Sequence, residues 1–362
     1  MKITDVQAIP LYIPLKETPP LSTSGRASGY HVLVKVLTDE GVTGYGECFR
    51  FTPRAVCAFV EEGLKPHLIG QDPTQVERLW NRMYTVTFRW GRKGMALNAI
   101  SGVEIALWDI IGKWRNLPLY EMTGGLCRER IKGYASLQVY ATPADVVTVA
   151  LRCLEQGYTA IKLHQRDMES LRAVREAVGP DITLMVDVNG AWNPRQAVEK
   201  AREMAEYNIL WLEEPVSPMD DYDGLAYVRE RSEVLIAAGE NEYTHYGFRD
   251  MISRRAVDVV QPDVIKAGGV LECRKVFALA EAWNLRVATH CFCFGPGMAA
   301  NLHLSMTNMR SEYVEVNAQP LEAPFMHPDM RPEGGYLTLP DGPGLGIEID
   351  EEVVKRYPYT GQ

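Results

Sequence analysis

The alternation of apolar and polar positions divides the chain into two regions, and the first has the character of an α+β domain. Residues 1–50 alternate as strands do, and the segments 31–36 and 42–48 predict a β-hairpin about the turn at 39–41. Within 99–114, apolar residues recur at spacings of three and four, which predicts one buried helix face. The glycines at 124–125 then interrupt the pattern, so we expect the first domain to end there.

Beyond that point, short apolar runs alternate with amphipathic helical stretches such as 167–179 and 194–208. Eight runs have the length and composition of strands: 134–139, 159–164, 182–189, 209–215, 235–241, 258–265, 286–292 and 313–317. Repeated strand–helix alternation predicts parallel βαβ units, and eight of them predict a closed α/β barrel. A doubly wound open sheet is the alternative, but no GxGxxG motif opens a helix after the first of these runs.

We therefore expect three parts: an N-terminal α+β domain at 1–125, a barrel at 126–317, and a segment at 318–362 that returns to the first domain. The last segment is turn-rich and strand-like, unlike the repeat before it. Residues 15–30 are rich in Pro, Ser, Thr and Gly, which predicts a mobile loop suited to covering a hydrophilic substrate.

Composition excludes several classes of protein. The chain has 362 residues, 46% of them hydrophobic, and a net charge of −9, which argues against binding to nucleic acid or to an anionic membrane. No uninterrupted apolar run approaches the roughly 18 residues that span a bilayer, and the N-terminus lacks the apolar centre of a signal peptide. Seven cysteines without a CxxC pair indicate reduced thiols. We expect a cytoplasmic protein.

Ionisable residues stand at or near the carboxyl ends of seven successive predicted strands, at intervals of 23–27 residues. They are Lys162, Asp187, Glu213, Glu240, Asp263, His290 and Glu315. The carboxyl ends of barrel strands meet at one rim, where barrel enzymes carry their active sites. A single charge at a strand end is usually just solvated, but seven in phase predict one shared pocket.

Three of these residues, Asp187, Glu213 and Glu240, supply carboxylates from consecutive strands. Converging carboxylates repel one another unless a cation lies between them, and an all-oxygen set suits Mg²⁺. The neighbouring Glu214 should face the other side of its strand, outside the direct ligand set.

Candidate acid–base groups flank the carboxylates. Lys162 and His164 alternate on one strand and should share a face, whereas Asp263 can orient His290 from the adjacent strand. Glu315 can donate a hydrogen bond to a substrate oxygen if it is protonated. This layout suits removal of a proton next to a carboxylate, with an enediolate as the intermediate.

The residues in these segments resemble the enolase superfamily, within the mandelate racemase and muconate lactonizing enzyme family and its mandelate-racemase-like subgroup. The similarity spans nearly the whole chain and rests on segments such as "MVDVNGAW", "WLEEP", "GEN", "QPDVIKAGG" and "VATH". It implies a modified (β/α)7β barrel with an N-terminal capping domain. It also implies Mg²⁺ on the three carboxylates, His290 with Asp263 as one acid or base, Glu315 as a general acid, and Lys162 as the first Lys of a Lys-x-Lys motif. Asn189, Glu214 and Lys266 should support the site from just outside it.

His164 departs from the family pattern, which usually has a second Lys there. A His in this place can act as the base on one face of the substrate, because its unperturbed pKa of about 6.5 is near working pH. It can instead donate a hydrogen bond to a substrate hydroxyl, or be inert. The sequence leaves this choice open.

The function that these features predict is that of a Mg²⁺-dependent lyase that dehydrates a sugar acid to a 2-keto-3-deoxy acid. A racemase or epimerase of a 2-hydroxy acid or an amino acid derivative, with His164 and His290 on opposite faces, is one alternative, and a lactone cycloisomerase is another. A non-catalytic barrel that binds a metal or an acid is a fourth. We expect a small-molecule carboxylate as substrate, no nucleic-acid or membrane partner, and a homo-oligomer.

Overall fold

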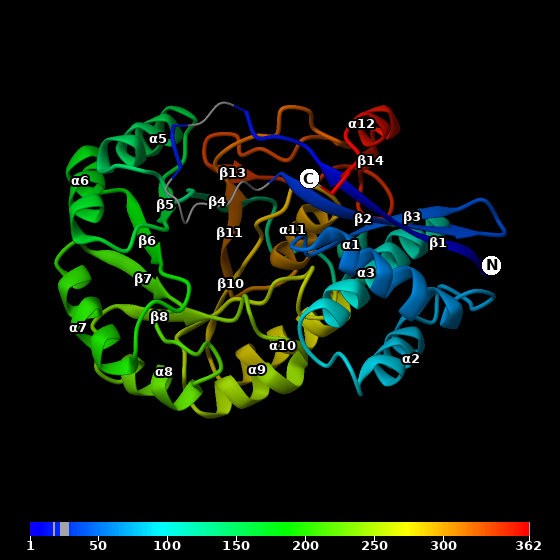
Figure 1. Ribbon diagram of the computed structural model, residues 1–362, viewed down its shortest axis with the longest axis horizontal. Coiled ribbons are helices and arrows are strands. Elements are labelled where there is room, and N and C mark those ends of the chain that lie inside the picture. The colour runs from blue at the N-terminus through cyan, green and yellow to red at the C-terminus, as the bar shows by residue number, and fades with distance from the viewer. Residues whose placement is uncertain (17–18, 22–28, 362) are drawn as a thin grey trace.

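The computed structural model describes residues 1–16, 19–21 and 29–361, and its main feature is a closed barrel beside a smaller domain (Figure 1). Eight parallel strands pair in chain order, and β11 pairs with β4 to close the ring. They are β4 (Ile131–Ser136), β5 (Ala160–Leu163), β6 (Thr183–Asp187), β7 (Ile209–Glu213), β8 (Leu235–Ala238), β9 (Val259–Val260), β10 (Arg286–Thr289) and β11 (Ser311–Asn317). The predicted barrel is confirmed, and the alternative of an open doubly wound sheet is wrong.

Helices connect the strands and cover the outside of the barrel. They are α5 (Pro143–Glu155), α6 (Met168–Val178), α7 (Pro194–Ala205), α8 (Tyr222–Arg229), α9 (Thr244–Ser253), α10 (Val270–Ala282) and α11 (Pro296–Met306). Local sequence sets where several begin. For example, the side chain of Asn193 accepts bonds from the first turn of α7, and Pro194 occupies the first helical position, where a missing N–H costs nothing.

The strand expected at 258–265 is shorter than predicted, because β9 covers only Val259–Val260. Pro262 has no N–H to donate to a neighbouring strand. Asp263 then begins a turn, in which its backbone carbonyl accepts from the N–H groups of Lys266 and Ala267. The early end of the strand leaves Asp263 at the barrel mouth, where an isolated parallel bridge still joins it to His290.

The N-terminal domain consists of an antiparallel sheet and the helices that pack on it. Its elements are β1 (Ile3–Tyr12), β2 (Tyr30–Thr38), β3 (Thr43–Cys48), α1 (Pro53–Ala58), the π-helix η1 (Phe59–Leu64), the 3-10 helix η2 (Lys65–His67), α2 (Val76–Thr87), α3 (Met95–Arg115) and α4 (Leu119–Met122). Helix α3 crosses β3 very closely, since a Cβ built on Gly46 would lie 1.9 Å from the carbonyl oxygen of Gly102. The predicted hairpin and buried helix are both confirmed.

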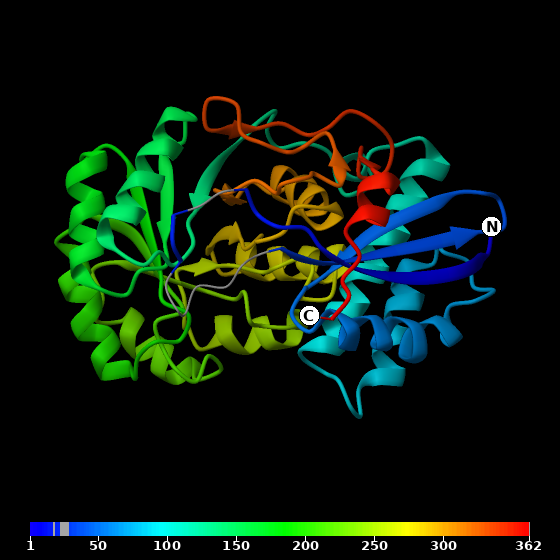
Figure 2. The same cartoon turned by 45° about the horizontal axis from the view of Figure 1, so that its top comes forward.

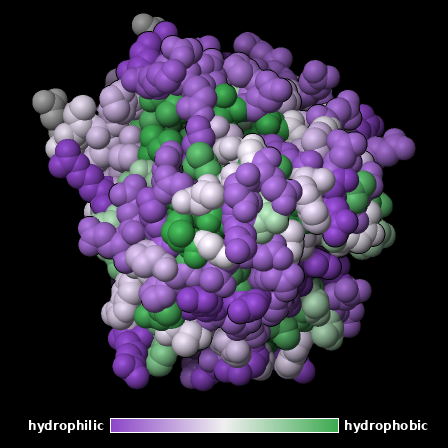
Figure 3. Space-filling model, turned by 90° about the vertical axis from the view of Figure 1, so that its right-hand side faces the viewer, coloured by the Kyte–Doolittle hydropathy of each residue, from purple (hydrophilic) through white to green (hydrophobic). Residues whose placement is uncertain are grey.

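Helix α3 is long and apolar enough to cross a membrane by length and composition, but 83% of its most apolar stretch is buried inside the protein. It is the core helix of the N-terminal domain, with buried residues on all sides. The outer face of this domain is largely hydrophilic, and its hydrophobic residues lie in small separate groups (Figure 3). The seven cysteines are all free thiols, as predicted.

The C-terminal segment returns to the N-terminal domain. Its elements are β12 (Met326–His327), β13 (Tyr336–Leu337), β14 (Glu348–Ile349) and α12 (Glu351–Arg356). Phe325 and Val354 pack in one buried cluster with Leu11 and Leu33 of the first sheet, while β13 pairs with the edge of β4. We propose the limits 1–125, 126–317 and 318–362 for the three parts on this basis.

The chain after β1 runs from the N-terminal sheet towards the barrel, where Leu21 forms a bridge with Tyr140 (Figure 2). Most of the loop expected at 15–30 lies outside the described residues, which omit 17–18 and 22–28. The prediction that this loop covers the substrate therefore stays a prediction.

One prediction concerns His303 of α11, which is fully buried. Its Nδ1 accepts from the Tyr120 N–H at 3.3 Å, and its Nε2 lies 3.2 Å from the Leu345 carbonyl oxygen. Burial lowers its pKa to about 4, so the folded protein holds it neutral. In the unfolded chain His303 takes up a proton below its ordinary pKa of about 6.5, whereas in the folded protein it does not. The free energy of unfolding should therefore fall by roughly 2 kcal/mol between pH 7 and pH 5.

Urea unfolding of the wild type and of His303→Asn at both pH values measures this contribution. The free energy of unfolding of His303→Asn should change less between the two pH values, whereas His67→Asn on the surface should behave as the wild type does. Equal pH dependence in all three proteins would contradict the assignment.

Candidate active site

The carboxylates of Asp187, Glu213 and Glu240 converge at the carboxyl ends of β6, β7 and β8. One ligand oxygen from each lies within 4.8 Å of the other two, and all three side chains are buried. Burial raises the pKa of Glu213 to about 7, although the ammonium of Lys162 lies 2.8 Å from it. Three buried oxygen donors at this spacing fit a hard divalent cation, which would remove their mutual repulsion.

Lys162 places a positively charged side chain next to these carboxylates. It is fully buried, and its Nζ lies 2.8 Å from Glu213, 3.0 Å from Glu315 and 3.6 Å from Asp187. A buried ammonium is stable only when such partners surround it. Here the carboxylates raise its pKa well above the ordinary value, although burial alone would lower it.

Glu315 lies beside Lys162 and His290, and its predicted role as a general acid stays a prediction. Burial would raise its pKa, but the charges of Lys162 and His290 outweigh burial and lower it to about 2. Its Oε2 also accepts from the backbone N–H of Cys291 at 2.8 Å. These charges favour the ionised form of Glu315, which contacts both Lys162 and the chain next to His290.

His164 lies one residue beyond the end of β5, on the same face as Lys162. Its Nε2 is 3.2 Å from Oδ2 of Asp187, and its Nδ1 is 2.5 Å from the carbonyl oxygen of Leu137. Burial would lower the pKa of His164, but Asp187 raises it. The ring lines the cavity above the carboxylates, so it is open to a ligand.

His290 and Asp263 form the predicted dyad. Nδ1 of His290 lies 2.6 Å from Oδ2 of Asp263, and the backbones of the two residues form a parallel β-bridge. Nε2 of His290 points to the metal set, 2.8 Å from Glu240. Although burial would lower its pKa, Glu240 and Glu315 raise it well above the ordinary value. His164 and His290 thus contact different carboxylates of the triad.

Glu214 does not keep the strand alternation that the sequence analysis assumed. Strand β7 ends at Glu213, and Glu214 takes a left-handed conformation with φ of 45°. Its carboxylate accepts from Nδ2 of Asn241 at 2.8 Å, and the same amide donates to Glu240 at 2.9 Å. Lys266 donates in turn to Oδ1 of Asn241 at 2.7 Å. Asn241 thus links Glu214 and Lys266, whose supporting role stays a prediction.

Asn189 also lies where it was expected. Its backbone N–H donates to Oδ1 of Asp187 at 2.9 Å, and its side chain lines the cavity. Asn241 was missed by the sequence analysis, although it directly follows Glu240. An amide next to a predicted ligand was the signal available.

A cavity of about 560 Å³ lies above the carboxylates. His164, His290 and Glu240 line it from the barrel, whereas Phe49, Arg50 and Phe51 line it from the N-terminal domain. The sequence analysis missed the segment after β3 as a part of the site. Its unusual aromatic–arginine–aromatic order was the available signal, but only the fold brings it over the barrel.

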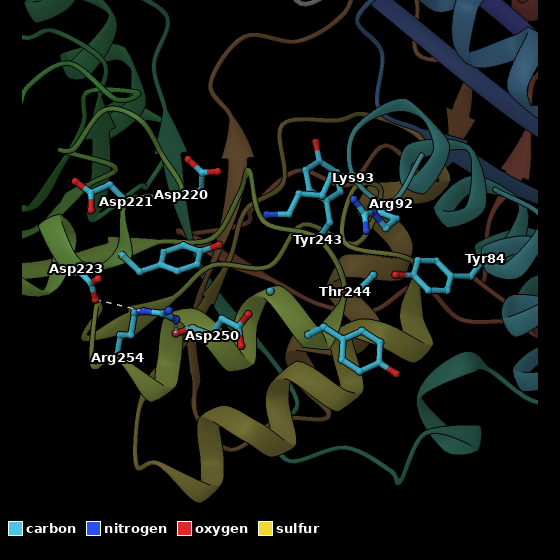
Figure 4. Close-up of a pocket in the computed structure, with 13 residues that line it drawn as sticks. Tyr84, Arg92, Lys93, Asp220, Asp221, Asp223, Tyr243, Thr244, Asp250 and Arg254 are labelled. Atoms are coloured by element: carbon cyan, nitrogen blue, oxygen red, sulfur yellow. Dashed lines mark hydrogen bonds and ion pairs between the residues drawn. The ribbon is translucent and has the colours of Figure 1, made fainter. Parts of the chain in front are cut away.

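A second cavity of about 500 Å³ opens between the two domains (Figure 4). Tyr84, Arg92 and Lys93 reach it from the N-terminal domain, and acidic residues of the barrel face them, with an ion pair of 3.3 Å between Arg254 and Asp223. None of the predicted strand-end residues lines this cavity. The predicted catalytic residues His164 and His290 line the cavity above the triad instead.

Comparisons with known proteins agree with this geometry. Residues 8–124 match the family model of the mandelate racemase/muconate lactonizing enzyme N-terminal domain, and residues 145–353 match the model of the enolase C-terminal domain-like fold. The chain belongs to the mandelate racemase/muconate lactonizing enzyme family of the enolase superfamily. The resemblance and the fold predicted from the sequence are both confirmed.

The relatives of this family member include enzymes that act on sugar acids and their lactones. The chain is 35% identical to the D-galactarolactone cycloisomerase of Agrobacterium fabrum, with 99% of each chain covered. It is 34% identical to the L-rhamnonate dehydratase of Saccharopolyspora erythraea, with 96% of this chain and 91% of the relative covered. The crystal structure of the 3,6-anhydro-D-galactonate cycloisomerase from Zobellia galactanivorans matches with a TM-score of 0.89 at 30% identity, covering 99% of this chain and 100% of that one.

The carboxylate triad predicts how metal binding depends on pH. Binding of Mg²⁺ requires the ionised form of Glu213, whose pKa is about 7. Affinity should therefore be about half of its maximum at pH 7, approach the maximum about one pH unit higher and fall at lower pH, with about half a proton released per ion at pH 7 from Glu213 alone. Isothermal titration calorimetry in two buffers of different ionisation enthalpy measures both quantities.

Glu213→Gln should lower Mg²⁺ affinity by at least about tenfold, because it removes one of three charged ligands. It should still fold, since Lys162 keeps Glu315 at 3.0 Å. The exposed Glu233→Gln is the matched control. Wild-type affinity in Glu213→Gln would show that the ion binds elsewhere.

Proposed function

We propose that the protein is a Mg²⁺-dependent lyase that dehydrates a sugar acid to a 2-keto-3-deoxy acid. The observation that carries this proposal is the position of two histidines at different carboxylates of one buried triad, His164 at Asp187 and His290 at Glu240. Dehydration needs a base for the α-proton and an acid for the departing hydroxyl. The relatives that are sugar-acid dehydratases support the same reaction class.

Asp187, Glu213 and Glu240 would hold the ion, and Mg²⁺ bound there would polarise the substrate carboxylate and make the α-proton more acidic. Lys162 supplies a fixed positive charge beside the same group. His290 is held by Asp263, and Glu240 and Glu315 raise its pKa well above the ordinary value, so it gives its Nε2 proton to the leaving hydroxyl. Glu315 positions Lys162 and the backbone after His290, instead of donating a proton.

His164 is the base in this proposal. Its Nε2 is turned to the triad and its ring borders the cavity, whereas Lys162 is enclosed by three carboxylates and is held charged. Three carboxylates hold the Lys162 ammonium charged, whereas His164 contacts Asp187 alone and would lose its proton once a cation occupied Asp187, so His164 is the better acceptor on this side. Asn189, Glu214 and Lys266 orient the ligands through the hydrogen bonds described above.

A lactone cycloisomerase is the second candidate. The 35% identity to D-galactarolactone cycloisomerase favours it, and that reaction also fits an acid and a base on separate sides of one metal site. A racemase or epimerase would use the same two histidines as alternating bases. Release of a 2-keto acid distinguishes dehydration from both alternatives.

We infer that the chain is a cytoplasmic enzyme and that it forms a homo-oligomer. The free cysteines and the hydrophilic outer face of the N-terminal domain support a soluble protein in a reducing compartment. Its substrate is a small-molecule acid.

Variants of His290 and Asp263 test the proposed dehydratase reaction directly. A panel of sugar acids, assayed for 2-keto acid with Mg²⁺, should contain at least one substrate of the wild type. His290→Asn should reduce its turnover by about 10²–10⁴-fold or more, because the general acid is lost. Asp263→Asn should also be severely impaired, whereas Mg²⁺ affinity should change little in either variant. Near-normal turnover by His290→Asn would mean that another group supplies the proton.

The role of His164 is tested by exchange of the substrate α-proton with deuterium from solvent. His164→Ala should stop this exchange if His164 is the base, whereas a purely binding role would weaken affinity by about tenfold and leave exchange measurable. His164→Lys, which restores the usual family motif, should be milder than His164→Ala. Exchange at the wild-type rate in His164→Ala would move the base to Lys162.

A further inference from the structure

Two arginines line the catalytic cavity without a carboxylate partner. Arg50 follows β3 in the N-terminal domain, and Arg166 follows β5 in the barrel. Among residues 1–16, 19–21 and 29–361, no carboxylate forms an ion pair with either guanidinium. Neither residue takes part in the proton transfers proposed above.

Arg50 is the more informative of the two because it is only 5% exposed. The rings of Phe49, Phe51 and Phe292 lie 5.6, 5.5 and 5.0 Å from its guanidinium carbon. Nη1 donates to the Phe292 carbonyl oxygen, and Nε is buried without an acceptor among the described residues. Burial lowers the pKa of Arg50, since no anion is close enough to offset the loss of water.

A buried guanidinium with five N–H donors and one acceptor from the protein is incompletely satisfied. Chains seldom bury a cation in this way unless it serves a ligand, because desolvation is costly without an anion. The aromatic surroundings also exclude water, which strengthens the attraction of any anion that enters. Arginine is well suited to bind a carboxylate through two parallel hydrogen bonds.

The charges around the cavity indicate where that anion belongs. Glu240 is the one carboxylate that lines it among the described residues, while Arg50, Arg166 and Lys266 contribute positive charge. The reacting carboxylate already has its counter-charges at Lys162 and the ion site. The arginines are therefore in excess of what a substrate with one carboxylate requires.

We propose that Arg50, assisted by Arg166, binds a second carboxylate at the end of the substrate opposite the reacting one. This inference rests on the proposed function and names its substrate class: aldaric acids, whose carbon chain ends in two carboxylates, or their monolactones. An aldonic acid has a neutral hydroxymethyl group at that end and would leave Arg50 without an anion. A phosphate ester could offer a similar charge, and the test includes it.

Binding is measured by calorimetry with Mg²⁺ in the His290→Asn background, so that no turnover is needed. Matched pairs share their configuration: D-glucarate with D-gluconate, galactarate with D-galactonate, and xylarate with xylonate. The diacid should bind about 10- to 100-fold more tightly in at least one pair. Equal or tighter binding of the monoacid in every pair, or no binding of any member, would overturn the inference. Tighter binding of 6-phosphogluconate than of D-glucarate would overturn the assignment to a carboxylate.

Variants of the two arginines show which side chain produces the preference for the diacid. Arg50→Gln should remove most of the preference for the diacid and leave affinity for the monoacid nearly unchanged, whereas Arg50→Lys should keep part of it. Arg166→Gln changes an exposed side chain, so it should fold normally and show a smaller loss of the same kind. Arg115→Gln, at the exposed end of α3, is the matched control and should show none.

If Arg50→Gln weakens the binding of both members of a pair equally, Arg50 only stabilises the chain at the Phe292 carbonyl and the inference is wrong.

The same experiment separates this inference from the proposed reaction. Selective binding of a diacid, combined with no 2-keto acid from any pair in the wild type, would leave the second carboxylate site intact and refute the dehydratase.

Discussion

Four carboxylates are buried together at the mouth of the barrel, and their mutual repulsion is the constraint on which the site depends. Asp187, Glu213, Glu240 and Glu315 come from different strands and share little water. Lys162 lies within 3.6 Å of three of them and stabilises the cluster from below. One ammonium cannot neutralise four carboxylates, so the remaining charge attracts cations to the cavity side: histidine protons in this structure, and a divalent ion in the proposed enzyme. Burial raises the pKa of Glu213 to about 7, whereas the positive charges of Lys162 and His290 lower that of Glu315 to about 2.

The position of these residues could be predicted from the sequence because barrel geometry is periodic. Once strands and helices alternate at nearly constant intervals, the carboxyl ends of all strands meet, and residues such as Lys162 and Glu315 must converge although they are far apart in the chain. Details that depend on how a strand ends could not be predicted in this way. Strand alternation placed Glu214 on the opposite face, but the positive φ after β7 turns it back to Asn241. The protonation of Glu315 likewise depends on distances to Lys162 that no sequence pattern contains.

The contribution of the N-terminal domain was the least predictable part, because it depends on how two separate folds dock. Glu47 is buried and accepts from the backbone N–H groups of Gly295 and Gly297, each at 3.1 Å. Arg50 donates to the carbonyl oxygen of Phe292. Both contacts hold the chain that directly follows His290. The capping domain therefore packs against the chain after His290 and forms a wall of the cavity with the same short segment, so the proposed substrate contact and the proposed general acid share one support.

The proposed enzyme depends on a single divalent metal site at the buried carboxylates, with a histidine on each side. Anomalous X-ray diffraction from a crystal soaked in Mn²⁺, used in place of Mg²⁺, locates that site. We expect one strong peak at about 2.1 Å from an oxygen of each of Asp187, Glu213 and Glu240. A peak in the acidic cavity beside Asp220 and Asp223 instead, or no peak at the triad, would contradict it.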